Sequence, residues 1–254
     1  MLENIKLALF DLDGTVYLGD KKIEGAIEAL NALSEKIKVA FLTNNSSKSG
    51  EVYKRKLSKM GYAKPVDIIS STTACAEFLV NHKKGKSVFP VGNADFCAEL
   101  TAYGVKLVHD ETADIVVLAF DTELTYGKLK VAHNLLMKGA EYIATHPDLV
   151  CPTETGSMPD TGSMLELFRA STGRAPDVIC GKPYAVMAEA VARRYPFAPS
   201  QIMMVGDRLY TDIAFGVNNG YKSVLVLSGE TTKEDYEKSK VRATYVLNDI
   251  TEIK

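Results

Sequence analysis

Short apolar segments alternate with amphipathic segments along nearly the whole chain, and this alternation constrains the fold more than any other feature. The segments "IKLALF" (5–10) and "KVAFLT" (38–43) are strand-length and almost entirely apolar, as expected for strands buried on both faces. Between them, residues 24–35 carry apolar side chains at helical spacing. The pattern therefore predicts an α/β fold, in which a parallel sheet is covered by helices.

Local signals predict where the helices begin and end. Residues 48–61 ("KSGEVYKRKLSKMG") read as a helix that Gly61 closes in the C-terminal capping position. The helix after "II" (68–69) has a run of hydroxyl residues at 70–72 to supply its N-terminal cap. These signals agree with the alternating pattern.

The alternation of strands and helices restarts near residue 84, so it forms two series. The first series resumes late in the chain. The middle block ends in a polar, glycine-containing stretch at 151–163 ("CPTETGSMPDTGS"), expected to be a loop, followed by one more helix. One sheet interrupted by an inserted domain explains this better than a single very wide sheet. We predict a core formed by 1–79 and 179–254, with an inserted α/β domain at 80–178.

Composition narrows the class of function. The 254 residues carry a formal net charge of -2, so no basic surface for nucleic acid and no polybasic membrane patch is expected. The longest apolar runs are strand-length, and the first residues show no signal-peptide layout. Four widely spaced cysteines without a C-x-x-C pair are typical of reduced thiols. We expect a cytoplasmic protein that acts on small molecules.

Polar residues of an unusual kind follow several predicted strands. Asp11 and Asp13 come directly after the first strand, Thr43 ends the second, and Lys182 and Asp207 follow two later ones. Ligands of open parallel sheets bind at the carboxyl ends of strands, so these side chains are expected in one crevice. Two carboxylates so close repel each other unless a cation or a reaction uses them. Carboxylate oxygens suit Mg²⁺, whereas a hydroxyl and an ammonium suit phosphate oxygens.

Four segments together resemble a known family. The segments "DLDGTVY", "FLTNNS", "GKP" and "VGDRLYTDI" are similar to the four motifs of the haloacid dehalogenase-like phosphatase superfamily. The insert resembles the large α/β cap of the subgroup that contains p-nitrophenyl phosphatases, pyridoxal phosphate phosphatases and the N-acetylglucosamine-operon nucleotidase. The resemblance implies a Rossmann-like parallel-sheet core with an inserted α/β cap domain.

The resemblance also implies roles for the aspartates. Asp11 would be the nucleophile, and Asp13 would protonate the leaving oxygen and later deprotonate the attacking water. A Mg²⁺ ion would be held by Asp11, by Asp13 through its backbone carbonyl, and by Asp207. Asp212 would lie behind the metal ligands and orient either metal-bound waters or a neighbouring lysine. From the residues alone, Asp212 could equally be a helix N-terminal acid.

The phosphoryl group and the rest of the substrate are expected to meet different parts of the chain. The resemblance assigns the transferring phosphoryl group to Thr43, Asn44 and Lys182. A crevice at the end of a sheet is open, so the insert must cover it and exclude bulk water. We predict that His146, Asp148 and the loop at 153–163 face Asp11 and contact the leaving group.

Hydrolysis of small phosphate monoesters, such as sugar phosphates or nucleoside monophosphates, is the predicted function. A phosphomutase is an alternative, although phosphomutases usually carry a helical cap after the first motif. A receiver-type signalling protein also uses clustered acids, a hydroxyl and a lysine, but it would be about half this length. A non-catalytic regulator that binds phosphometabolites is the third alternative. The resemblance also allows a homodimer, because caps in this subgroup often mediate dimers.

Overall fold

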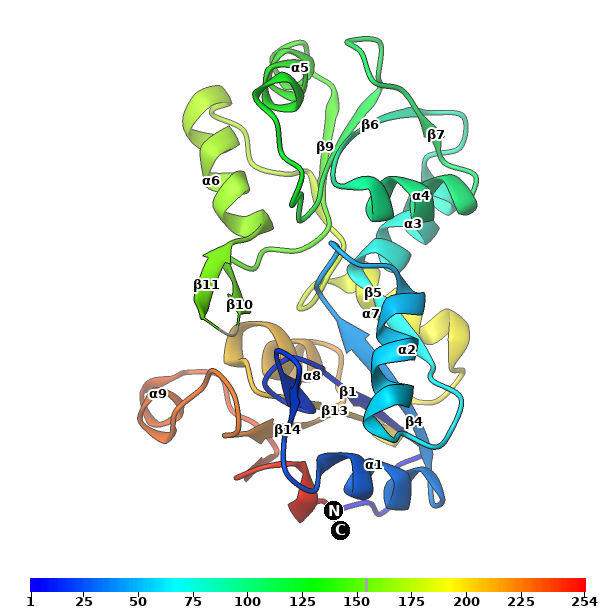
Figure 1. The fold of residues 1–254 in the computed structure, drawn as a ribbon, viewed down its shortest axis with the longest axis vertical. Coiled ribbons are helices and arrows are strands. Elements are labelled where there is room, and N and C mark those ends of the chain that lie inside the picture. The colour runs from blue at the N-terminus through cyan, green and yellow to red at the C-terminus, as the bar shows by residue number, and fades with distance from the viewer. Residues whose placement is uncertain (154) are drawn as a thin grey trace.

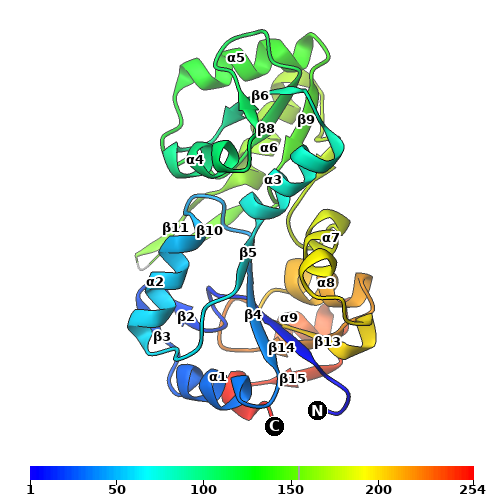
Figure 2. The ribbon, with the colours of Figure 1, turned by 90° about the vertical axis from the view of Figure 1, so that its right-hand side faces the viewer.

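The computed structural model describes residues 1–153 and 155–254 and arranges them as two α/β units, one above the other in Figures 1 and 2. The lower unit is built on a parallel sheet in the order β15-β14-β13-β1-β4-β5, with β1 between β13 and β4. Its strands are β1 (Leu7–Phe10), β4 (Lys38–Thr43), β5 (Ile68–Ser70), β13 (Ile202–Gly206), β14 (Lys222–Val226) and β15 (Tyr245–Leu247).

Side-chain alternation in β1 explains why its sequence is apolar throughout. Leu7 and Leu9 belong to the hydrophobic cluster on one face of the sheet, and Ala8 and Phe10 belong to the cluster on the other face. One face is covered by α1 (Ala26–Ser34) and α2 (Gly50–Met60), and the other by α3 (Ser71–His82), α7 (Ala185–Arg194) and α8 (Ala214–Asn218). Since both faces are covered, no position in the strand calls for a polar residue.

The upper unit has its own parallel sheet, in the order β12-β9-β8-β6-β7. Its strands are β6 (Ser87–Val91), β7 (Lys106–Leu107), β8 (Ile115–Leu118), β9 (Glu141–Ala144) and β12 (Val178–Ile179). Helices α5 (Tyr126–Met137) and α6 (Thr161–Thr172) pack on one face, and α3 and α4 (Ala94–Ala102) on the other. A single hydrophobic cluster that contains Leu9 of β1 and Val117 of β8 joins the two units. The predicted α/β class and Rossmann-like core are thereby confirmed.

The predicted helix ends are also present. Gly61 adopts φ 104° after α2, in the left-handed region where glycine costs least, and its N–H closes the last turn. At the start of α3, the Ser70 hydroxyl accepts a hydrogen bond of 3.0 Å from the N–H of Thr73. Both ends follow from the local sequence.

The segment at 151–163, which we expected to be a polar loop, has regular structure instead. It forms an antiparallel hairpin of β10 (Val150–Thr153) and β11 (Gly156–Pro159), and α6 already begins at Thr161. No residue of the two strands, 150–153 and 156–159, is buried, so the sequence has no apolar alternation that would predict this hairpin. Asp160 caps α6 by accepting a 2.6 Å hydrogen bond from the N–H of Thr161.

The strand before Lys182 is a second correction. We expected it to return the chain to the first sheet, but β12 pairs in parallel with β9 at the edge of the second sheet. The strands of the second sheet therefore run from Ser87 to Ile179, and the end of β12 falls on the proposed boundary at 178–179. The domain limits 1–79, 80–178 and 179–254 stay a proposal.

Smaller elements complete the chain. They are the hairpin of β2 (Tyr17–Leu18) and β3 (Lys21–Lys22), η1 (Pro199–Gln201), the π-helical turn η2 (Leu209–Ile213), α9 (Lys233–Lys238) and η3 (Ile250–Glu252). Both termini lie at the end of the molecule away from the upper unit (Figure 2). No helix in the described part of the chain is long and apolar enough to cross a membrane. All four cysteines in that part are free, as predicted.

Candidate active site

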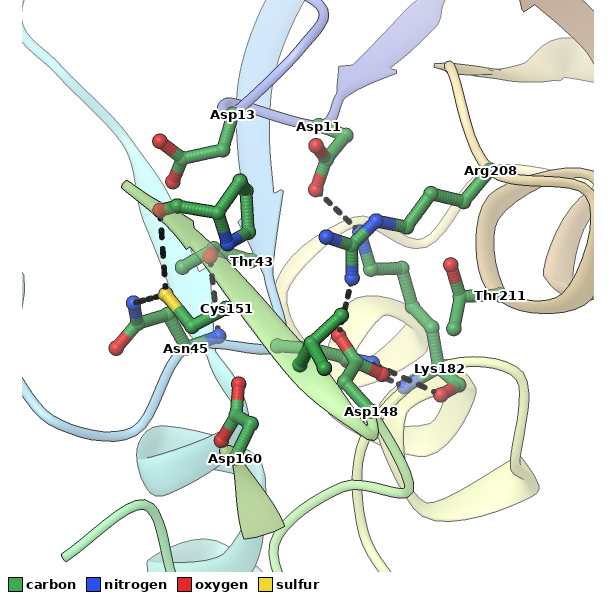
Figure 3. A pocket seen from close by; sticks show the side chains of 13 residues that line it. Asp11, Asp13, Thr43, Asn45, Asp148, Cys151, Asp160, Lys182, Arg208 and Thr211 are labelled. Atoms are coloured by element: carbon green, nitrogen blue, oxygen red, sulfur yellow. Dashed lines mark hydrogen bonds and ion pairs between the residues drawn. The ribbon is translucent and has the colours of Figure 1, made fainter. Parts of the chain in front are cut away.

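The carboxyl ends of strands from both sheets meet around one small cavity. Asp11 follows β1, Thr43 ends β4 and Asp207 follows β13, all in the first sheet, whereas Lys182 arrives from β12 of the second. The cavity encloses about 30 Å³, and Figure 3 shows side chains from both units pointing into it. Its lining consists of Asp11, Asp13, Thr43, Asn44, Asn45, Asp148, Val150, Cys151, Pro152, Asp160, Lys182, Arg208 and Thr211.

Lys182 is the central cation of the site, and its side chain is almost fully buried. Its Nζ donates hydrogen bonds of 2.6 Å to Asp11 Oδ1, 2.6 Å to Asp212 Oδ1 and 2.9 Å to the carbonyl of Leu42. Burial alone would lower the pKa of Lys182, but Asp11 and Asp212 outweigh burial, so the pKa is raised and the amine stays charged. Of the two roles predicted for Asp212, the structure supports the contact with Lys182.

Asp11 combines deep burial with this strong ionic contact. Burial raises the pKa of Asp11 well above its usual range, and the Lys182 ammonium opposes that rise. A cation beside Asp11 is therefore needed to keep its carboxylate ionised, which is the form that can act as a nucleophile. Lys182 supplies one such cation.

Three carboxylates offer a place for a second cation. One oxygen from each of Asp11, Asp207 and Asp212 lies within 4.8 Å of the other two. Burial and the neighbouring Asp212 raise the pKa of Asp207 to about 7, so these acids repel each other as they stand. A buried, all-oxygen donor set of this kind fits Mg²⁺. The Asp13 carboxylate lies outside this set among the described residues, and metal binding by the Asp13 backbone carbonyl stays a prediction.

Glycines make room for this carboxylate group. A Cβ atom built on Gly14 or Gly229 would overlap the carboxylate of Asp207, and one on Gly206 would overlap Asp212. Backbone donors complete the support, since the N–H of Glu230 donates a 2.6 Å hydrogen bond to Asp207 Oδ2. The close approach of the backbone fixes where the metal-binding oxygens point.

Asp13 lies apart from the other acids, on the side of the cavity that also holds Asn45 and Cys151 (Figure 3). Burial raises the pKa of Asp13 from its usual range, and the charges of Lys56 and Lys48 oppose the rise. A carboxyl with a raised pKa keeps its proton to higher pH than an ordinary aspartate and can donate it. The two aspartates of the first motif thus have different surroundings, as one nucleophile and one acid require.

The predicted phosphate-binding residues divide into two kinds. Thr43 and Lys182 line the cavity with a hydroxyl and an ammonium. Asn44 also lines it, but its side chain is fully engaged: Nδ2 donates to Asp148 Oδ1 (2.9 Å) and to the Lys182 carbonyl (3.0 Å), while Oδ1 accepts from the Lys182 N–H (2.8 Å). The Asn44 side chain therefore holds Lys182 and Asp148 in place, and phosphate binding by Asn44 stays a prediction.

Asp148 connects the upper unit to the lower one. Besides Asn44, it accepts a 3.0 Å hydrogen bond on Oδ2 from Arg208, which follows Asp207 in the lower unit. The same guanidinium forms a 2.9 Å ion pair with Glu230. Burial raises the pKa of Asp148, and the Arg208 charge opposes this. Asp148 lines the cavity as predicted, with Arg208 as an unpredicted partner.

His146 is a further correction, because its side chain is fully buried and does not line the cavity. Its Nε2 lies 3.0 Å from the Thr161 hydroxyl and 3.5 Å from Asp160 Oδ1, and its Nδ1 lies 3.9 Å from Asp148 Oδ1. Burial lowers the pKa of His146 to about 4, so the ring is neutral at physiological pH. It supports Asp148 and Asp160 from behind and does not touch a substrate in the cavity.

Sequence reasoning also missed several residues that line the cavity. Among the described residues of the predicted 153–163 loop, which exclude 154, only Asp160 lines this cavity, whereas the hairpin strand β10 contributes Val150, Cys151 and Pro152. Arg208 was inside a quoted motif but carried no assigned role. Its position directly after Asp207 indicated that Arg208 lies near the site. Its ion pair with Asp148 could not be predicted, because the two residues are 60 positions apart in the sequence.

Comparisons with known proteins agree with this geometry. Two family models match the chain, one described as haloacid dehalogenase-like hydrolase over residues 8–106 and one as HAD-hydrolase-like over residues 179–253. An acid sugar phosphatase of Staphylococcus saprophyticus subsp. saprophyticus is 36% identical over an alignment of 254 residues, which covers 99% of this chain and 98% of that protein. The chain therefore belongs to the haloacid dehalogenase-like hydrolases.

Solved structures narrow the class further. A 4-nitrophenylphosphatase from Thermotoga maritima matches with a TM-score of 0.93 at 41% identity, covering 99% of this chain and 97% of that one. A glycerol phosphate phosphatase from Mycobacterium tuberculosis, solved in complex with magnesium, gives a TM-score of 0.89 at 32% identity and covers 98% of this chain and 77% of that one. Within its superfamily the protein is a phosphatase.

Proposed function

We propose that the protein is a Mg²⁺-dependent phosphatase that hydrolyses small phosphate monoesters through an aspartyl-phosphate on Asp11. The observation that carries this proposal is that Asp11 and Asp13 have different surroundings in the cavity. Lys182 contacts Asp11 directly, and Asp207 and Asp212 lie beside it, whereas Asp13 lies apart from this group; burial raises the pKa of both Asp11 and Asp13. Relatives named acid sugar phosphatase and glycerol phosphate phosphatase support substrates of this size.

In the first half-reaction, an Asp11 carboxylate oxygen attacks phosphorus and forms the acyl phosphate. The bond between phosphorus and the ester oxygen breaks, and Asp13 gives its proton to that oxygen as the alcohol leaves. The Lys182 ammonium and the Thr43 hydroxyl are placed to hold the transferring phosphoryl oxygens. The metal-binding residues would be Asp11 and Asp207, and a bound Mg²⁺ would neutralise charge on the phosphoryl group.

In the second half-reaction, Asp13 is an ionised carboxylate and can take a proton from one water molecule. That water attacks phosphorus, the acyl phosphate bond breaks, and Asp11 and Asp13 return to their starting forms. Asp148 and Arg208 close the cavity over these groups, which limits access of further water. This role for the Asp148–Arg208 ion pair explains why a residue of the upper unit reaches so far into the site.

The test is phosphate release from a panel of monoesters, including p-nitrophenyl phosphate, with Mg²⁺ and after verified metal removal with EDTA. Asp11→Asn should abolish turnover, because the amide is nearly isosteric but cannot attack. Asp95→Asn, which changes an exposed acid on α4 outside the cavity, is the matched control and should keep full activity.

Two outcomes would contradict the proposal. One is activity of Asp11→Asn above a few per cent of wild type, and the other is full activity without metal. Rapid quenching followed by mass spectrometry should place the trapped phosphate on Asp11. Transfer of that phosphate to a second hydroxyl of the product, instead of to water, would indicate the phosphomutase alternative. Binding of esters with no phosphate release would indicate the regulator.

A further inference from the structure

A second cavity, which we call the distal cavity, adjoins the active-site cavity on the Asp13 side. The two share Asp13, Asn45, Cys151 and Pro152 in their linings. The distal cavity encloses about 300 Å³, against about 30 Å³ for the space beside Asp11. The first space has room for little more than a phosphoryl group, whereas the second has the size of a small-molecule site.

The position of Asp13 between the two cavities defines what each one can hold. The inference rests on the proposed function, in which Asp11 attacks phosphorus and Asp13 protonates the leaving oxygen. That oxygen must lie within hydrogen-bond reach of Asp13, and the rest of the leaving group must extend beyond it. The distal cavity is the space that opens there.

Both units form the walls of the distal cavity. The lower unit contributes the β2–β3 hairpin and α2, and the upper unit contributes the β10–β11 hairpin and the residues after β8. The lining residues beyond the four shared ones are Tyr17, Gly19, Asp20, Ser47, Lys48, Tyr53, Lys56, Phe120, Thr122, Thr153 and Met158. A leaving group bound there would contact both units at once.

Two lysines, Lys48 and Lys56, and two acids, Asp13 and Asp20, line the distal cavity. Lys56 is already engaged, since its Nζ donates a 2.7 Å hydrogen bond to the Gly19 carbonyl, lies 3.5 Å from Asp20 Oδ1 and sits over the Tyr17 ring at 3.7 Å. Lys48 is exposed and has neither an ion pair nor a hydrogen bond among residues 1–153 and 155–254. One lysine of this cavity is therefore available to an anion.

Uncommitted polar groups accompany this lysine. In the described structure, the only partner of Asn45 Nδ2 is the Cys151 thiol at 3.9 Å, and the buried Tyr17 hydroxyl has no hydrogen-bond partner. Polar groups buried without partners are rare in folded proteins and usually await a ligand or water. Asn45 is only partly buried and lines both cavities, so its amide N–H groups suit hydroxyl or carbonyl oxygens of a ligand.

We propose that the distal cavity binds the leaving group of the substrate, and that this group carries an acidic substituent that pairs with Lys48. The substrate class is a small hydroxylated phosphate monoester with a second anionic group, either a carboxylate or another phosphate. Lys48 selects for that group and takes no part in the transfer of phosphate.

Matched pairs of esters test the proposal. 3-Phospho-D-glycerate and sn-glycerol 1-phosphate have the same configuration at the central carbon and differ only in a carboxylate against a hydroxymethyl group, and glucose 1,6-bisphosphate and glucose 6-phosphate differ in a second phosphate. For wild type, kcat/KM should favour the acidic member of at least one pair. Lys48→Met should reduce this preference by about 10- to 150-fold, the range for one hydrogen bond to a charged group.

The ratio within a pair is the quantity to compare, because loss of the Lys48 charge also affects Asp13, equally for both esters. Lys48→Arg should retain the preference, since it retains the charge. Lys59→Met is the matched control, because it removes an exposed lysine of α2 that lies outside both cavities. If Lys48→Met reduces the preference in only one pair, that pair shows whether the second anionic group is a carboxylate or a phosphate.

Binding measurements separate this inference from the proposed function. Asp11→Asn should bind the esters without turning them over, and calorimetry should find the same preference in Kd, again lost in Asp11→Asn/Lys48→Met. Absence of turnover by wild type on every ester would refute the phosphatase assignment of the site. A wild-type preference for the esters that lack a second anionic group, or a preference unchanged by Lys48→Met, would overturn the role of the distal cavity while leaving the phosphatase chemistry intact.

Discussion

His146 should make the folded protein sensitive to acid, by an amount that the structure allows us to work out. The ring is fully buried, and its Nδ1 has no hydrogen-bond partner among the described residues. Burial lowers the pKa of His146 to about 4 in the folded state, from 6.5 for an unperturbed histidine. The folded state therefore resists protonation that the unfolded state accepts.

The sign and size follow from this difference. Because the folded-state pKa is depressed, the stabilising contribution is complete above pH 6.5 and is lost as the pH falls towards 4. The whole difference of pKa corresponds to about 3 kcal/mol, and about 2 kcal/mol of it is already lost at pH 5. Buried acids such as Asp13 and Asp148 have raised pKa values and act in the opposite direction, so the total pH profile cannot isolate His146.

The comparison of wild type with His146→Gln isolates the contribution of His146, because the buried acids are present in both proteins. Free energies of unfolding in urea should be measured at pH 7.5 and pH 5. Between these values wild type should lose about 2 kcal/mol more than the variant, whatever constant cost the substitution has. His109→Gln, which replaces an exposed histidine, should behave like wild type. Parallel pH profiles of wild type and His146→Gln would refute the reasoning.

Three further predictions concern the site. Asp13→Asn should lower kcat by roughly 10²- to 10⁴-fold with an unchanged circular dichroism spectrum, because the amide can neither donate nor accept the proton. Gly229→Ala should raise the Mg²⁺ concentration for half-maximal activity by about 10-fold or more, because its Cβ would push the Asp207 carboxylate; an unchanged metal titration would contradict this. Arg208→Met should destabilise the protein by about 3 kcal/mol in unfolding experiments by leaving Asp148 buried and unpaired, and Asp148→Asn should recover part of that loss in the double variant.

The strands and their terminal polar residues could be predicted because their physical signal is local. β1 is apolar on both faces and ends where Asp11 begins, so sequence alone located the nucleophile candidate. The hairpin of β10 and β11 gave no such signal, because no residue of either strand is buried. Its strands are held by pairing with each other, which leaves no apolar pattern in the sequence.

The depth of a side chain was the other property that the sequence did not reveal. His146 and Asp148 are two positions apart, yet Asp148 lines the cavity and His146 lies behind it. The partner of Asp148 is Arg208, which the chain brings in from another unit after 60 residues. Such distant pairing depends on tertiary packing, which a local sequence pattern does not report. The homodimer and the cytoplasmic location stay predictions.

The placement of β12 has a consequence for how such a protein can diversify. Because Lys182 follows a strand of the upper sheet and reaches down to Asp11, the upper unit delivers part of the phosphate chemistry and not only a cover. A different upper unit could replace this one only if the residues after its last strand placed a lysine side chain beside Asp11. New substrate preferences are therefore more easily acquired by changing the walls of the upper unit than by replacing it.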